Sequence, residues 1–359
     1  MRRSQLYVAL GALAVLTASC SSDSATSTAT PDADVGETTT TVDAYAAPPG
    51  EVASAEPTPS IGCGVDDPPS AVSLERRTLA GSDRWYLLTV PPAHDGTAPL
   101  PLVLDFHGLS EGAELHAGTS GFGPYAEEHG LIAVFPNGTG APVRWEGGSD
   151  RSANADLVFV DALLDELEAS LCVDTSRVYA TGFSNGALFS SVIACTMAER
   201  VTAVAPMAGV NVPASCEGSR PVPMIGFHGT ADPILLFNGG VGDRLGRVLG
   251  GGGAGEEEPL PEADLDGDGY PANAAAWAAR NGCEPEPSDS DLTPSVIERT
   301  WTCPSGTDVV FEIMVGAGHS WPGSEFTKSI EQIVGPTDMS IDGTDMMWRF
   351  FQRFALPQA

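Results

Sequence analysis

The chain has 359 residues, 42% of them hydrophobic, and its 48 acidic residues against 17 basic ones give a formal net charge of −31. This composition is typical of a folded protein with one large core. A surface this acidic repels nucleic acid and anionic lipid, and we therefore expect no nucleic-acid partner. Because Lys328 is the only lysine, chemistry through a Schiff base is also disfavoured.

The first 20 residues have the organisation of an export signal. Arg2 and Arg3 form a basic start, the apolar stretch 6–16 is too short for a stable membrane anchor, and small residues at 17–19 precede Cys20. This arrangement is similar to a bacterial lipobox, so we expect lipidation of Cys20 and a location outside the cell, held to the outer face of the membrane by the lipid alone. The alternative is ordinary signal cleavage with Cys20 incidental.

Three regions follow this leader. Residues 21–60 are rich in Ser, Thr, Ala and Pro and lack large apolar residues, so they are expected to form a disordered tether. Residues 61–359 are long enough for one folded domain, expected to be a monomer. Within that domain, the stretch 239–270 is rich in glycine and acidic residues and is interpreted as a loop insertion.

Six cysteines remain once Cys20 is set aside, and an even count in an exported chain predicts disulfides. None is in Cys-x-x-Cys spacing, which disfavours a zinc site or a redox pair. Sequence alone cannot choose among the possible pairings. Pairing local neighbours suggests the hypothesis Cys195–Cys216, Cys283–Cys303 and, by remainder, Cys63–Cys172.

The folded region alternates between two hydrophobic patterns. Short apolar runs bounded by Pro and Gly predict strands at 84–90, 101–106, 131–135, 177–180, 203–207, 222–227, 296–303 and 309–315. Apolar residues at helical spacing predict helices at 156–171, 187–194 and 344–354. This alternation predicts an α/β fold, with a mostly parallel sheet and helices on both faces.

A small-residue turn joins the predicted strand 177–180 to the helix that follows. It reads Gly182-Phe183-Ser184-Asn185-Gly186, the Gly-x-Ser-x-Gly pattern of a nucleophile elbow, in which the glycines allow a tight turn that exposes the serine hydroxyl. A serine that only caps a helix is the alternative reading of such a pattern.

A serine nucleophile needs a histidine base and a carboxylate that orients it. In α/β-hydrolases the three follow in the order Ser, Asp, His, each after a strand. Asp232 and His319 follow the predicted strands 222–227 and 309–315 in this order, which predicts a triad with Ser184. His228 is a rival base that we interpret as a support of the acid loop, and the other histidines considered are interpreted as structural, namely His94, His116 and His129.

The reaction also needs two N–H groups that bind the oxyanion. We expect one from Asn185, directly after the nucleophile at a helix N-terminus. The second is expected from Leu109, in the loop after the strand 101–106.

Several motifs in this order resemble the esterase / polyhydroxybutyrate-depolymerase family, which is similar to feruloyl and acetylxylan esterases and to mycobacterial LpqC-type esterase lipoproteins. The motifs are Asp105-Phe106-His107-Gly108, Phe135-Pro136-Asn137-Gly138, the elbow, His228-Gly229-Thr230-Ala231-Asp232 and Gly318-His319-Ser320-Trp321-Pro322-Gly323. The resemblance runs from about residue 73 to the C-terminus. It implies the α/β-hydrolase fold and a serine esterase that needs no cofactor, with Ser184, Asp232 and His319 as nucleophile, acid and base.

The resemblance leaves the substrate open among feruloyl, acetyl and hydroxyalkanoate esters, small, oligomeric or attached to polysaccharide. Trp145 and Trp321 look like the family's recurring tryptophans near the cleft, where they line the substrate pocket or are buried core indoles. Ala187 stands where the family often has a second glycine. We expect no polymer-adsorbing domain after the catalytic one, which favours soluble esters or oligomers as substrates.

One acidic segment resembles the start of a calcium loop. It has oxygen donors at loop positions one, three and five, Asp264, Asp266 and Asp268, and a glycine at position six. Position twelve of that loop would be Ala275 instead of the usual glutamate, so a structural calcium site and an empty acidic turn stay equally open. A second hypothesis for the whole chain follows: a non-catalytic envelope lipoprotein that binds glycan or calcium.

Overall fold

The computed structural model describes residues 53–65, 68–213, 216, 218–248 and 259–357. The predicted signal peptide with Cys20, and the predicted tether as far as residue 52, lie outside the described residues. Within them, no helix is long and apolar enough to cross a membrane.

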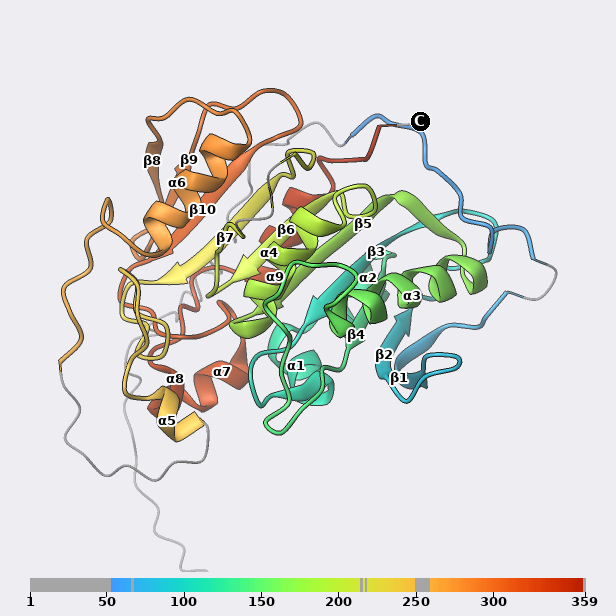
Figure 1. Ribbon diagram of the computed structural model, residues 1–359, viewed down its shortest axis with the longest axis horizontal. Coiled ribbons are helices and arrows are strands. Elements are labelled where there is room, and N and C mark those ends of the chain that lie inside the picture. Colours follow the sequence, from blue (N-terminus) through green and yellow to red (C-terminus); the bar gives the residue numbers. More distant parts are fainter. Residues whose placement is uncertain (1–52, 66–67, 214–215, 217, 249–258, 358–359) are drawn as a thin grey trace, which may run out of the picture. The chain divides into compact units, whose positions relative to one another are not determined.

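One sheet runs through the described part of the chain, with its ten strands in the order β1-β2-β4-β3-β5-β6-β7-β10-β9-β8 (Figure 1). The strands are β1 Val72–Thr78, β2 Trp85–Val90, β3 Leu100–Phe106, β4 Ile132–Pro136, β5 Val173–Phe183, β6 Ala203–Met207, β7 Met224–Gly229, β8 Ser288–Thr293, β9 Val296–Thr300 and β10 Val309–Met314.

The central strands β4, β3, β5, β6, β7 and β10 pair in parallel, and β1, β2, β9 and β8 add antiparallel edges. The centre is covered on both faces, so its strands are continuous apolar runs, as in β4, where all five residues are buried. The edge strand β8 has the polar sequence SDSDLT, which gave no strand signal in the sequence, and its charges protect an exposed edge.

Helices cover both faces of the sheet (Figure 1). The helices are α1 Gly112–Ser120, α2 Phe122–His129, α3 Ala155–Ser170, α4 Asn185–Thr196, α5 Leu245–Val248, α6 Tyr270–Arg280, α7 Glu325–Ser329, α8 Glu331–Val334 and α9 Gly343–Phe351. Apolar side chains of α3, α4 and α6 pack in one core cluster with Leu102 and Leu104, while those of α1, α2 and α9 pack in the other with Val103. Alternate residues of β3 therefore face opposite cores. The mostly parallel α/β fold predicted from the sequence is confirmed.

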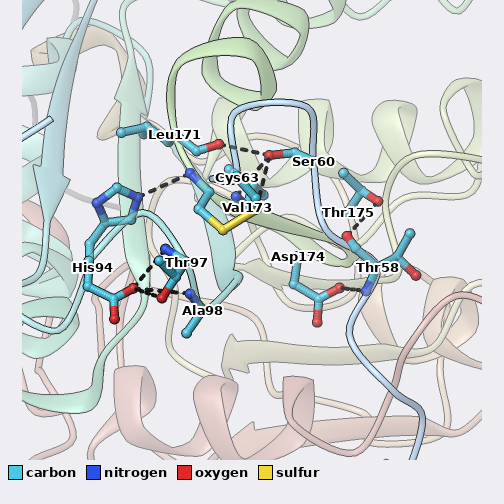
Figure 2. Close-up of a disulfide and its surroundings, with 12 residues drawn as sticks. Thr58, Ser60, Cys63, His94, Thr97, Ala98, Leu171, Val173, Asp174 and Thr175 are labelled. Carbon is cyan, nitrogen blue, oxygen red and sulfur yellow. Dashed lines mark hydrogen bonds between the residues drawn. A yellow bond between two sulfur atoms is a disulfide. The ribbon is translucent and has the colours of Figure 1, made fainter. Parts of the chain in front are cut away.

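The segment before β1 is bound to the domain (Figure 2). Cys63 is disulfide-bonded to Cys172 at the start of β5, and the backbone N–H of Ser60 donates to the carbonyl of Val173 at 2.9 Å. Earlier still, the N–H of Ala53 donates to the carbonyl of Gln352 at 3.2 Å. Residues 53–60 therefore belong to the folded domain, whereas the sequence placed them in the tether, because their backbone polar groups find partners that composition does not reveal.

The other two disulfides are local. Cys195 at the end of α4 pairs with Cys216, and Cys283 after α6 pairs with Cys303 beyond β9. With Cys63–Cys172, these are the three pairings suggested from the sequence. The long-range bond closes a loop of 109 residues and the local ones close loops of 21 and 20. In the chain-entropy model the longest loop restricts the unfolded chain most.

The predicted insertion 239–270 contains regular structure. It holds the short helix α5, and α6 begins at its last residue, Tyr270, beside β10 (Figure 1). Residues 249–258 of the insertion lie outside the described residues. The sequence missed α6 because its YPANAAAWAAR stretch is mostly alanine, with few large apolar residues to mark a helical face.

Glu312 is a buried acid in the middle of β10. The side chain is 0% exposed, and neither carboxyl oxygen has a hydrogen-bond partner in the described structure. Glu298 lies directly opposite on β9. Burial, and then repulsion from Glu298, raise the pKa of Glu312 well above its ordinary value. Folding therefore favours the neutral form of Glu312 relative to an exposed glutamate.

Glu312→Leu is expected to stabilise the protein at pH 7 by about 1–3 kcal/mol, the typical penalty for a buried unsatisfied polar group. The pKa of Glu312 is higher in the folded protein than in the unfolded chain. The wild type therefore carries no ionisation penalty below the unfolded pKa and loses stability as pH rises toward the folded pKa. Urea unfolding should show that Glu312→Leu has a higher free energy of unfolding than the wild type at pH 7, and that this difference is smaller at pH 4. The exposed substitution Glu284→Gln is the control, and a gain independent of pH would contradict this account.

Candidate active site

The nucleophile elbow lies between β5 and α4. Ser184 has φ 55° and ψ −115°, a strained backbone conformation for a residue with a side chain, as at many functional sites. It stands at the N-cap position of α4, yet its hydroxyl makes no capping hydrogen bond. The structure thus disfavours the alternative that Ser184 only caps the helix, and the hydroxyl is left for another use.

The glycines of the elbow are required by close backbone contacts. A Cβ at Gly186 would lie 2.0 Å from the carbonyl oxygen of Phe106, and a Cβ at Gly182 would lie 2.7 Å from the same oxygen. Contacts this short do not occur for real side chains, so the elbow packs directly on the end of β3 only because both positions are glycine.

Asp232 and His319 meet at the same edge of the sheet. Asp232 follows β7 and His319 follows β10, which is the parallel neighbour of β7. Nδ1 of His319 donates to Oδ2 of Asp232 at 2.7 Å, and both residues are buried. The ring centroids of His319 and Phe183, the residue directly before Ser184, also lie 4.7 Å apart. The imidazole of His319 is therefore held beside the elbow by its carboxylate partner.

The carboxylate of Asp232 is held from several sides. Its Oδ1 accepts the backbone N–H groups of Ile234 and Leu235, each at 2.8 Å. Burial alone would raise the pKa of Asp232, but the attraction of His319 and the hydrogen bonds from His228 and His319 outweigh it and hold this pKa well below its ordinary value. Asp232 therefore stays ionised wherever the protein is folded near neutral pH.

His228 lies on the other side of the acid. Its Nε2 is 3.3 Å from Oδ2 of Asp232 and 2.9 Å from the carbonyl oxygen of Leu235. Both partners are acceptors, so Nε2 carries a proton and donates. The ring stacks on Tyr270 with 3.7 Å between ring centroids. His228 thus ties the acid loop to α6 and does not face the elbow as a rival base would.

The oxyanion loop, residues 107–111, follows β3. The N–H of Gly108 donates to Glu111 Oε2 at 2.7 Å and that of Ser110 donates to the carbonyl of Val143 at 2.8 Å, while the N–H of Leu109 has no hydrogen-bond partner among the described residues. Asn185 is the first residue of α4, where backbone N–H groups lack an intrahelical acceptor. Both N–H groups expected to bind the oxyanion are therefore available.

The side chain of Asn185 has a role of its own. Its Oδ1 accepts the backbone N–H of Trp145 at 2.7 Å, and its Nδ2 donates to the carbonyl of Trp145 at 3.3 Å. The indole N–H of Trp145 in turn donates to the carbonyl of His107 at 3.0 Å. Asn185 thus connects the elbow helix to the oxyanion loop through Trp145.

Comparison with known proteins places this chain in a family. The chain is 31% identical to the probable feruloyl esterase C of Aspergillus niger over 235 residues, which cover 61% of this chain and 82% of that protein. The chain belongs to this feruloyl esterase family. It is also 27% identical to feruloyl esterase B of Piromyces equi over 282 residues, which cover 76% of this chain and 46% of that protein.

Several members of the feruloyl esterase family are longer than the region aligned with this chain. The chain spans 46%, 66% and 59% of the length of three of these curated relatives. An acetyl xylan esterase from Aspergillus awamori has a similar fold, with a TM-score of 0.51 and 16% identity over 78% of this chain and 100% of that one. No general protein-family model matches the chain.

Both tryptophans proposed to line the pocket of this feruloyl esterase family member are buried. Trp145 is 2% exposed and stacks on Phe189 with centroids 5.0 Å apart, and Trp321 is 1% exposed with its indole N–H donating to Thr344 at 3.0 Å. So little exposed surface gives a substrate almost nothing to touch. The structure therefore favours the other interpretation left open by the sequence, two core indoles beneath the site.

The acidic turn 264–268 is held by protein contacts. Asp264 Oδ1 accepts the N–H of Asp266 at 3.1 Å, and the carboxylate of Asp266 pairs with Arg299 at 3.0 Å. In the described ranges, no three side chains of the kinds that bind metals converge, including Asp264, Asp266 and Asp268. The turn as described is organised by Arg299 and by the side chain of Asn238, which donates to the carbonyls of Asp264 and Asp268.

Asn185→Ala is expected to lower kcat/KM roughly ten-fold. It removes two hydrogen bonds, each worth about 0.5–1.5 kcal/mol, but leaves the backbone N–H of residue 185 in place. Initial rates with p-nitrophenyl acetate measure the change. A loss above roughly a thousand-fold, the upper range for deleting an oxyanion donor, would contradict a side-chain role limited to support.

Sequence reasoning missed the groups behind the oxyanion loop. His116, interpreted from the sequence as a structural histidine, lies 2.6 Å from Asp105 and 3.1 Å from Glu111. The available signal was an acid at the end of an otherwise apolar strand, Asp105, followed by further ionisable residues at 111 and 116. In a buried strand such an acid needs a partner.

Proposed function

We propose that the chain is a serine carboxylic-ester hydrolase. The observation that carries the proposal is the hydrogen bond from His319 Nδ1 to Asp232 Oδ2 at 2.7 Å, beside an elbow serine whose hydroxyl caps nothing. This bond fixes the imidazole with its proton on Nδ1 and leaves Nε2 as the base. Membership of the feruloyl esterase family supports the same reaction.

In the proposed mechanism Ser184 Oγ attacks the ester carbonyl carbon while His319 Nε2 takes its proton. The N–H groups of Asn185 and Leu109 bind the oxyanion that forms. His319 then gives its proton to the leaving alcohol, which departs and leaves an acyl group on Ser184. Water attacks this acyl group by the same base catalysis and releases the acid. No step uses a metal or another cofactor.

For the substrate we propose feruloyl or acetyl esters of polysaccharides, with soluble hydroxybutyrate oligomers as the further candidate. The names of the relatives support the feruloyl esters, and the resemblance of the motifs supports the acetyl esters and the hydroxybutyrate oligomers. A screen of methyl ferulate, acetylated xylan and hydroxybutyrate oligomers separates them. We expect kcat/KM to be highest for one of the polysaccharide-type esters, and a preference for the oligomers would reverse the order.

A covalent probe tests the reaction class. A fluorophosphonate should label the folded protein on Ser184, located by mass spectrometry of its peptides. An unlabelled protein that hydrolyses no ester would instead favour the non-catalytic glycan- or calcium-binding lipoprotein.

We also propose that the protein acts outside the cell as a monomer, anchored by lipid on Cys20. The lipobox-like leader supports the anchor. Cys20→Ser should move the protein from the membrane fraction to the medium without changing kcat, because Cys20 belongs to the lipobox-like leader and not to the proposed catalytic residues. Retention of the variant in the membrane would contradict the lipid anchor.

A further inference from the structure

Three ionisable side chains behind the oxyanion loop, those of Asp105, His116 and Glu111, are joined by hydrogen bonds. The proposed mechanism does not use them. Nε2 of His116 lies 2.6 Å from Oδ1 of Asp105, and its Nδ1 lies 3.1 Å from Oε2 of Glu111. The side chains of Asp105 and His116 are 0% exposed and that of Glu111 is 10% exposed. They come from the end of β3, from α1 and from the residue that precedes α1.

The charged forms of His116 and Glu111 favour each other. Both ring nitrogens of His116 face carboxylate oxygens, so both carry protons. Burial alone would lower the pKa of His116, but the attraction of Asp105 and Glu111 raises it to about 10. Likewise, the attraction of His116 outweighs burial and lowers the pKa of Glu111. Well-packed apolar residues are often at least as stabilising as a buried ionic cluster, so stability alone does not account for this one.

Glu111 connects the cluster to the oxyanion loop. Its Oε2 accepts the N–H of Gly108 at 2.7 Å, and its Oε1 accepts the hydroxyl of Thr119 at 2.6 Å. An ionised acceptor makes a stronger hydrogen bond to a backbone N–H than a neutral one. The carboxylate therefore fixes the amide on one side of Gly108.

The other side of Gly108 is fixed by His107. The carbonyl oxygen of Gly108 lies 2.7 Å from His107 Nδ1, which donates to it, while His107 Nε2 accepts the N–H of Gly138 at 2.9 Å. In a trans peptide the carbonyl and the following N–H point in opposite directions. With the carbonyl of Gly108 held toward His107, the N–H of Leu109 points the opposite way, free to meet the oxyanion.

We propose that Asp105, His116 and Glu111 are positioning residues. They fix the N–H of Gly108 and so, together with His107 on the Gly108 carbonyl, keep the Gly108–Leu109 peptide in the orientation that binds the oxyanion. His116 keeps Glu111 ionised and in place, and Asp105 orients His116. The inference rests on the proposed ester hydrolysis, and none of the three side chains touches the substrate.

The test compares Glu111→Ala and Glu111→Gln with Glu114→Gln, an exposed control on the same helix. Glu111→Ala is expected to lower kcat about 100-fold, the lower range for losing an oxyanion donor, with KM changed less than about three-fold. The affinity for phenylboronic acid, which becomes a tetrahedral anion on the serine, should fall by the same factor as kcat/KM. Glu111→Gln keeps the shape of the side chain without its charge, so its kcat should lie between those of the wild type and Glu111→Ala. Glu114→Gln should match the wild type.

A double-mutant cycle tests the order of action. If His116 acts through Glu111, then His116→Ala should lower kcat little further in a protein that already carries Glu111→Ala. The losses of kcat caused by the two substitutions should therefore be far from additive. Thr119→Val removes the hydrogen bond to Oε1 of Glu111 and leaves the contact of Glu111 with His116 in place. A loss of roughly five-fold in kcat is expected. This milder variant keeps the inference testable should the Glu111 variants fail to fold.

The outcomes are distinct. A wild type that hydrolyses no ester overturns the proposed function, whereas an active wild type whose Glu111 and Thr119 variants keep kcat and boronate affinity overturns only this inference. Titration of active sites with a fluorophosphonate counts the competent molecules. If the fall in kcat equals the fall in titratable sites, the cluster has a structural role only and the inference is wrong.

Discussion

Ser184→Ala is expected to lower kcat by roughly a million-fold, the scale seen when a triad nucleophile is removed. The substitution deletes the only atom that attacks the ester in the proposed mechanism. KM should change little because no part of the substrate pocket is altered. Hydrolysis of p-nitrophenyl acetate, followed with enough protein to detect the background rate, measures the loss.

The fold should survive this change. Ser184 adopts a φ of 55°, which alanine tolerates no worse than serine, and its hydroxyl makes no capping bond that the variant would lose. Ser191→Ala is the matched control, since Ser191 lies on the same helix with its hydroxyl bonded to the carbonyl of Ala187 at 3.1 Å. Residual activity of Ser184→Ala within a hundred-fold of the control would show that another nucleophile carries the reaction.

The centre of the fold and the elbow could be predicted because their signals are local. A strand buried on both faces is a continuous apolar run, as in β3, and the turn around Ser184 needs glycines where side chains would collide with Phe106. The order of Asp232 and His319 after their strands then placed them at one edge, since parallel strands end together.

The missed features depend on contacts between distant segments. The polar strand β8 and the bound segment 53–60 exist because neighbouring backbone satisfies their hydrogen bonds, which no local pattern records. Likewise Glu111 joins His116 to Gly108 only in three dimensions. The burial of Trp145 and Trp321 follows from packing around them, so sequence could name the residues but not choose between pocket and core.

Asp232→Asn is expected to lower kcat about ten-thousand-fold, the effect known for this change in a serine triad. The carboxylate accepts the Nδ1 proton of His319 at 2.7 Å, which leaves Nε2 without a proton. An asparagine can turn its NH2 group toward Nδ1, and the ring then holds its proton on Nε2 and cannot accept one from Ser184. Labelling by a fluorophosphonate should slow in parallel with kcat, whereas KM should stay within about three-fold of the wild type.

Stability provides a second readout that separates this variant from the exposed control Asp83→Asn. The pKa of Asp232 is lower in the folded protein than in the unfolded chain, so its contribution is present above the unfolded value of about 3.9 and is lost as pH falls through the folded value. The wild type should therefore exceed Asp232→Asn in unfolding free energy at pH 7, and the difference should shrink below about pH 4. A difference that is constant with pH would mean that the carboxylate is not held ionised by the histidines, and the orienting role of Asp232 would lose its electrostatic basis.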